Sequence, residues 1–184
     1  MNRFSVWFAG FVVLFAGCAG APEAPREEPI PAETVERARA LAATFKGSLK
    51  EALMEGLQDG PADTIGVCAF MAPEIAADLS VDGMRIGRTS HRLRNPANKA
   101  AAWVQPLIEA YRPTSPGAEP KAVRIDDSTV GYVEPLYVGK PCLVCHGQAV
   151  PDEVQQEILS VYPEDTATGF AEGEFRGVVW VEIR

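Results

Sequence analysis

The residues best suited to chemistry lie in one short segment, Pro-Cys-Leu-Val-Cys-His-Gly, at positions 141–147. Cys142 and Cys145 are separated by two residues and His146 follows directly, which is the attachment pattern of c-type haem. In this pattern the two thiols bind the porphyrin and the histidine ligates the iron. The sequence therefore predicts one covalently attached haem c, bound by Cys142, Cys145 and His146.

Half of a zinc site and a redox-active dithiol are the alternative interpretations of this pair of cysteines. A structural zinc site takes four ligands. Beyond this segment and the first 18 residues, the sequence offers only Cys68 and His91 as further thiol or imidazole ligands, and it contains no second Cys-x-x-Cys pair. Zinc is therefore the weaker interpretation.

The N-terminal residues 1–17 have the pattern of a signal peptide. Arg3 is followed by an apolar run over residues 6–16, and this run is shorter than the 18 or more residues of a membrane-spanning helix. The residues at positions 15–18, Phe-Ala-Gly-Cys, are similar to a bacterial lipobox, so we expect Cys18 to carry lipid and to tether the protein to a membrane surface. Secretion with an unmodified Cys18 is the alternative.

Composition then sets the expected location and domain organisation. Export leads to the periplasm, and Ala19 after the cysteine favours the outer membrane if the host is Gram-negative. Residues 18–33 are rich in proline and charge and should form a flexible tether, which leaves residues 34–184 as one domain. The formal net charge of −8 argues against a nucleic-acid partner. The expected partners are the membrane surface and an unknown redox or signalling protein.

The periodicity of apolar residues predicts both helices and strands, with one long helix near the N-terminus. Pro73 should interrupt the second helix, over residues 61–79, and Pro106 should bend or shorten the third, over residues 96–111. Helices are expected over residues 34–58, 61–79, 96–111 and 151–161, and strands over residues 81–89, 121–126, 129–138 and 175–183.

Cys68 remains unassigned once the other three cysteines are given to lipid and haem. An unpaired cysteine in an exported protein suggests a specific role, because disulfides are otherwise expected there. On the predicted second helix Cys68 shares a face with Ile65 and Ala72, so its side chain should point inward. That position suits a small buried side chain, and it equally suits a ligand of the haem iron. The competing ligands are His91, Met54, Met71 and Met84.

Four arginines fall within ten residues that contain no acid, namely Arg85, Arg88, Arg92 and Arg94. A solvated basic loop is one interpretation. The other is that one or two of them pair with the haem propionates, because a guanidinium group matches a carboxylate in shape and charge. We select Arg88 and Arg94 as these candidates.

Several segments together resemble a known family. They are Cys68, Ala-Pro-Glu-Ile-Ala at 72–76, Gly-Arg-Thr-Ser at 87–90, Leu-Arg-Asn-Pro at 93–96 with Asn98, the haem motif at 142–147, Tyr-Pro-Glu-Asp at 162–165, Ala167, Gly169, Phe170 and the final strand. In this order they are similar to the PAS-like monohaem c-type proteins of bacteria, a family also found as sensory domains of membrane histidine kinases. The resemblance covers about residues 34–184.

The resemblance implies both a fold and a ligand set. The implied fold is α+β and PAS-like, an antiparallel sheet flanked by helices, with the haem between sheet and helices. The implied axial ligands of the iron are His146 and Cys68.

Two classes of function follow from these expectations. The first is a module that senses redox state or a diatomic ligand through a haem with cysteine and histidine ligands. The alternative is a low-potential periplasmic electron-transfer protein, since a thiolate ligand favours oxidised iron. An enzyme is not expected, because His91 is the only histidine besides His146 and no paired acid and base surround it in the sequence.

Overall fold

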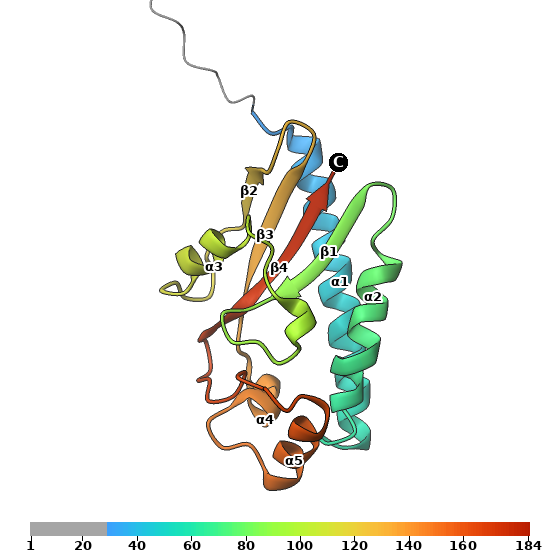
Figure 1. The fold of residues 1–184 in the computed structure, drawn as a ribbon, viewed down its shortest axis with the longest axis vertical. Helices are drawn as coiled ribbons and strands as arrows, with labels where there is room; N and C mark the ends of the chain where they lie inside the picture. The colour runs from blue at the N-terminus through green and yellow to red at the C-terminus, as the bar shows by residue number, and fades with distance from the viewer. Residues whose placement is uncertain (1–28) are drawn as a thin grey trace, which may run out of the picture.

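In the computed structural model, which describes residues 29–184, four strands form one antiparallel sheet (Figure 1). The strands are β1 at Met84–Thr89, β2 at Lys121–Arg124, β3 at Val130–Tyr137 and β4 at Phe175–Ile183, in the order β1-β4-β3-β2. All four predicted strands are therefore present, with β1, β2 and β3 shorter than predicted. The predicted signal peptide, Cys18 and residues 19–28 of the predicted tether lie outside the described residues.

Helix α1, Ala32–Asp59, covers one face of the sheet and confirms the predicted long N-terminal helix (Figure 1). Its buried side chains recur every three or four residues, at Ala38, Ala42 and Phe45. They pack against the side of β4 that carries Val179 and Val181. Phe45 is only 1% exposed, and full burial of a side chain of this size contributes about 1.5–3 kcal/mol to folding. The α+β class, with an antiparallel sheet flanked by helices, is confirmed.

The second predicted helix is present, but Pro73 does not interrupt it. Val67–Met71 forms a π-helix that leads directly into α2, Ala72–Asp78. The N–H group of Ala72 donates to the carbonyl of Val67, five residues earlier. Pro73 lies in the first turn of α2, where its missing N–H group is tolerated. The proline is thus accommodated by a wider helical turn instead of a break, and Cys68 lies in that turn.

The third predicted helix is present but is much shorter than predicted. Pro96–Asn98 forms a single 3-10 turn, and helix α3 begins only at Gln105 and ends at Tyr111. Pro106 lies at the start of α3, where a proline is favoured, so it begins the helix and does not bend it. Helix α3 covers the face of the sheet opposite α1, where Ile108 packs with Val178 (Figure 1).

Beyond one end of the sheet lies a group of short helical segments (Figure 1). The predicted helix over 151–161 is confirmed as α5, Asp152–Val161. The Cys-x-x-Cys-His segment itself forms a 3-10 turn, Lys140–Cys142, followed by one helical turn, α4, at Leu143–His146. Within residues 29–184, no helix has the length and apolar character needed to cross a bilayer.

Candidate functional site

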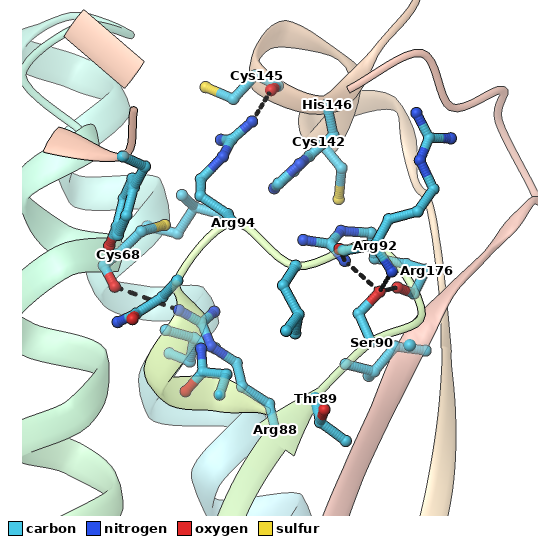
Figure 2. A pocket seen from close by; sticks show the side chains of 18 of the residues that line it. Cys68, Arg88, Thr89, Ser90, Arg92, Arg94, Cys142, Cys145, His146 and Arg176 are labelled. Atoms are coloured by element: carbon cyan, nitrogen blue, oxygen red, sulfur yellow. Dashed lines mark hydrogen bonds between the residues drawn. The ribbon is translucent and has the colours of Figure 1, made fainter. Parts of the chain in front are cut away.

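A cavity of about 250 Å³ lies where α1, the π-helix, the end of β1 and α4 converge (Figure 2). The loop after β1 and the start of β4 complete its wall. The structure brings all six site residues predicted from the sequence to this wall, namely Cys68, Arg88, Arg94, Cys142, Cys145 and His146. They come from segments that are far apart in the sequence, so the cavity is a product of the fold.

His146 is held by both its backbone and its ring. Its Nδ1 lies 2.6 Å from the carbonyl oxygen of Ala167, and its own carbonyl accepts the N–H group of Phe170 at 2.9 Å. The ring bond requires Nδ1 to carry the proton, which leaves the lone pair on Nε2. Burial, followed by the charge of nearby Arg176, lowers the pKa of His146 to about 2, so the ring is neutral. A neutral imidazole with a bonded Nδ1–H is the usual state of a metal-ligating histidine.

The residue after His146 must be glycine for a steric reason. A Cβ atom on Gly147 would lie 2.4 Å from the carbonyl oxygen of Leu143, which accepts the N–H group of Gly147 at 2.9 Å. A larger residue would break this close turn. Gly147 therefore ends α4 and lets the chain turn away beneath the imidazole ring.

Cys142 and Cys145 emerge from the same helical segment as His146 (Figure 2). Both are free thiols that are partly buried, and burial raises the pKa of Cys145. Within the described part of the chain, no group of three or more histidine, cysteine, aspartate or glutamate side chains could hold a metal ion. The zinc interpretation requires such a group and gains no support from the structure.

Cys68 reaches the cavity from a different wall than His146, on the helical side (Figure 2). None of the competing ligands lines the cavity. His91 instead stacks on the ring of Phe175, with 5.5 Å between ring centroids. Met54 and Met71 are 44% and 42% exposed. Of the described residues that carry sulfur or imidazole, only Cys68 and the three residues of the Cys-x-x-Cys-His motif therefore face this space.

The arginines give the cavity a cationic wall. Arg88, Arg92, Arg94 and Arg176 line it, and no aspartate or glutamate does. Among residues 29–184, Arg88 forms a single hydrogen bond, from its Nη2 to the carbonyl of Cys68 at 3.3 Å, so most of its donors remain available to a ligand. Arg85, from the same basic segment, instead pairs with Glu182 on the outside.

Arg176 is a site residue that the sequence analysis missed. Its Nη1 donates to the hydroxyl of Ser90 at 2.8 Å and to the carbonyl of Arg92 at 3.2 Å. Burial, followed by the charges of Arg94 and Arg88, lowers the pKa of Arg176 to about 10, so it stays protonated at neutral pH. Its only signal in the sequence was a cation at the start of an otherwise apolar strand.

The cavity wall matches the chemistry of a haem. The hydroxyl of Thr89 is buried there without a hydrogen-bond partner in the described structure, and beside four arginines it can bind an anionic group such as a propionate. Leucine side chains supply the apolar surface that a porphyrin needs, at positions 49, 53, 57, 93 and 136. The thiols and the imidazole add the attachment and ligand groups. The residues present therefore fit this cofactor.

Comparisons with known proteins agree with this fold. A family model described as Tll0287-like matches residues 26–184. Among solved structures, the chain is similar to the crystal structure of the cyanobacterial heme-protein Tll0287, with a TM-score of 0.60 and 22% sequence identity over 84% of this chain and 96% of that chain. A search of curated proteins found no match.

Proposed function

The chain belongs to the Tll0287-like family, and from this premise we propose that it is an exported protein with one covalently attached haem c, acting as a sensor of redox state or of a diatomic ligand. Cys142 and Cys145 would attach the porphyrin, and His146 and Cys68 would ligate the iron. The resemblance to a solved haem protein and the fit of the cavity wall both support a haem at this place.

One observation supports the proposal most strongly. Two side chains of types that can ligate iron, Cys68 and His146, line a single cavity together with the thiols of Cys142 and Cys145. The Nδ1 of His146 is occupied by the Ala167 carbonyl, which leaves Nε2 as its free ligating atom. The other described histidine and the described methionines lie elsewhere.

The bound haem would supply one-electron chemistry and a ligand-binding iron. The protein itself would bind the haem and surround it with charged groups. The arginines, Arg88 foremost because most of its donors are unused within the described residues, would pair with the propionates. A thiolate at Cys68 would favour ferric iron, because its negative charge offsets the metal's positive charge.

A sensor role is favoured over electron transfer by the position of Cys68. The residue lies in a π-helical turn, and such turns occur often at functional sites and less often in regular scaffold. A bound haem would supply an iron whose positive charge falls on reduction, and Cys68 is the residue that would respond, because a thiolate takes up a proton more readily with less positive charge beside it. The alternative remains a low-potential electron carrier, for which the thiolate ligand alone is sufficient. The proposal includes no enzymatic activity.

Ligand binding to the reduced protein tests the choice between the two roles. The parent is purified with haem attached, reduced, and exposed to carbon monoxide or nitric oxide while its optical spectrum is recorded. A sensor should bind the gas and shift its absorption bands. A carrier should keep both protein ligands and the spectrum of the reduced protein, and that result would contradict the sensor role.

Location and partners are further parts of the proposal. From the signal-peptide pattern and Cys18, the protein would lie in the periplasm, held by lipid at a membrane that would be the outer one in a Gram-negative host. The partner would be a redox or signalling protein. The net charge of −8 argues against nucleic acid.

A further inference from the structure

Arg94 and Asp165 form a buried ion pair beside the haem motif. Their side chains are 7% and 1% exposed. Arg94 donates from Nε to Oδ1 and from Nη2 to Oδ2, both at 3.1 Å, which is the bidentate geometry. Removing one partner of a buried pair leaves an uncompensated charge. The two side chains therefore hold a fixed position.

This pair joins the loop after α5 to the motif helix. Asp165 Oδ1 accepts the N–H group of Ala167 at 2.9 Å. On the other side, Nη2 of Arg94 donates to the carbonyl of Cys145 at 2.6 Å and, more weakly, to the carbonyl of Ala167 at 3.4 Å. The amide and carbonyl of Ala167 are thus both fixed by the same ion pair.

The Ala167 carbonyl is also the acceptor for Nδ1 of His146, at 2.6 Å. A carbonyl that accepts the Nδ1 proton makes the other ring nitrogen a stronger donor to a metal, and it fixes the orientation of the ring. The strength of this bond depends on where the carbonyl is held. Asp165 and Arg94 hold the Ala167 carbonyl in place, and they therefore influence the hydrogen bond between this carbonyl and His146 Nδ1.

We propose that Arg94 and Asp165 are positioning residues that set the hydrogen bond on His146 Nδ1 and, through it, the reduction potential of the iron. The inference rests on the proposed haem ligation by His146. It gives Arg94 a role other than the propionate contact expected from the sequence, since two of its three guanidinium nitrogens bind protein groups. Two short hydrogen bonds contribute most to this positioning: the one from Arg94 to the Cys145 carbonyl and the one from the Ala167 N–H group to Asp165. The contact from Arg94 to the Ala167 carbonyl, at 3.4 Å, contributes less.

Three variants of the haem-loaded protein test this inference. Arg94→Lys and Asp165→Glu keep the charges and change the geometry, because lysine lacks the planar fork and glutamate is one methylene longer. Asp165→Asn keeps the shape and removes the charge. Glu164→Gln is the matched control, since it removes the same charge from an exposed neighbour whose side chain forms no hydrogen bond or ion pair with residues 29–184. The readouts are the reduction potential from a spectroelectrochemical titration and the g values of the ferric EPR spectrum.

A weaker bond on His146 should make the imidazole a poorer donor and destabilise ferric iron. We expect Arg94→Lys and Asp165→Asn to shift the redox equilibrium about tenfold towards the reduced form, with altered g values, and Asp165→Glu to change both in the same direction. Glu164→Gln should match the parent. Parental potential and g values in all three variants would overturn the inference and leave the ion pair with a purely structural role.

Two further measurements keep the test decisive. If the variants fail to fold, electron–nuclear double resonance of the ferric parent should detect a His146 Nδ1 proton that resists exchange with deuterated water, and a freely exchanging proton would overturn the inference. Haem content is measured first by mass. A parent without one covalent haem would contradict the proposed function together with this inference, whereas unchanged variants with haem attached contradict the inference alone.

Discussion

At the scale of single residues, the account depends on what Cys68 does. Its thiol is partly buried at the cavity wall, and its backbone carbonyl accepts a hydrogen bond from Arg88. A buried thiol in apolar surroundings normally stays protonated and inert. A ferric iron in the cavity would instead favour the thiolate, because a metal ion deprotonates a coordinating thiol.

The substitution Cys68→Ala should therefore open the iron to added ligands. In the parent, the thiolate would occupy the sixth position most of the time, which lowers the apparent affinity for any competitor. We expect imidazole and cyanide to bind the ferric variant about tenfold or more tightly than the parent, and the reduction potential to rise. The measurement is a ligand titration followed by absorption.

The matched control for this substitution is Met71→Ala, which truncates an exposed sulfur-containing side chain in the same π-helix. It should leave the affinities and the potential unchanged. If Cys68→Ala binds both ligands as weakly as the parent does, Cys68 is only a buried side chain and the iron ligand lies elsewhere.

At this scale the sequence predicted which residues line the cavity but few of the contacts among them. Cys142, Cys145 and His146 were selected from the spacing of one motif, and Cys68 from the family resemblance and from being left unassigned, and all four line the cavity. By contrast, the burial of Arg94 against Asp165 joins residues 71 positions apart, and no local pattern announces such a pair. The same holds for Arg176, whose role depends on β4 beginning beside the cavity.

At the scale of elements, α1 is joined to the sheet by polar as well as apolar contacts. Lys46 of α1 forms an ion pair with Glu134 of β3, and Glu134 also accepts the hydroxyl of Tyr132 at 2.7 Å. The side chain of Glu134 is only 10% exposed. Burial, followed by the hydrogen bond to Glu134, raises the pKa of Tyr132, so its hydroxyl stays protonated and donates.

Replacing Lys46 by Met should leave this carboxylate without its cation. We expect the free energy of unfolding to fall by about 1–2 kcal/mol, less than for a fully buried pair because Lys46 is partly exposed. Lys50→Met, on an exposed position of the same helix, is the control and should change little. Urea unfolding followed by circular dichroism measures both. Equal midpoints for the two variants would mean that the ion pair contributes nothing.

Replacing glycine by alanine should have opposite effects on stability at two positions, Gly131 and Gly47. A Cβ atom on Gly131 of β3 would lie 2.6 Å from the ring of Trp103, whereas nothing lies within 4 Å of one on Gly47 of α1. Gly131→Ala should thus destabilise the fold by about 1–3 kcal/mol through overpacking. Gly47→Ala should stabilise it by about 0.5–1 kcal/mol, because glycine is unfavourable within a helix.

Chemical unfolding of the two glycine variants checks this pair of expectations against the parent. The sign of the change matters more than its size. A stabilised Gly131→Ala protein would show that Trp103 does not pack on β3 as described, and a destabilised Gly47→Ala protein would show that this position of α1 is not open.

Elements were predictable where one periodic pattern acts alone. The 3.6-residue repeat of α1 and the valine-rich run of β4 gave helix and strand at nearly the correct bounds. The errors occur at prolines. Pro73 was expected to interrupt a helix, but the π-helix before it continues into α2 without a break. Pro106 was expected to bend or shorten the third helix, and α3 is shorter than predicted because it begins only at Gln105, with Pro106 in its first turn. Which turn is the first depends on packing partners that the local sequence does not reveal.

At the scale of the whole molecule, the cavity is lined by the end of the sheet and by α4, and the N-terminal end of α1 lies at the opposite end of the molecule from α4 (Figure 1). A tether that precedes α1 would thus leave from the end far from the cavity. This arrangement would keep the cavity accessible to a partner while the protein is held at a membrane. It gives the proposed lipid anchor a consistent geometry.

The anchor itself can be tested through Cys18, which lies outside the described residues. If Cys18 carries lipid, Cys18→Ser should move the protein from the membrane fraction to the soluble periplasm with its haem content unchanged. Fractionation with immunodetection measures the distribution. An identical membrane fraction for variant and parent would exclude the lipid anchor and leave the signal peptide alone.

The central claim, a haem iron held between Cys68 and His146, is tested most directly by the EPR spectrum of the oxidised parent protein. A thiolate and a neutral imidazole are strong ligands, and together they should give a single low-spin ferric signal with the g values of cysteine–histidine ligation. A high-spin signal, or a low-spin signal of the histidine–methionine or bis-histidine type, would contradict the account.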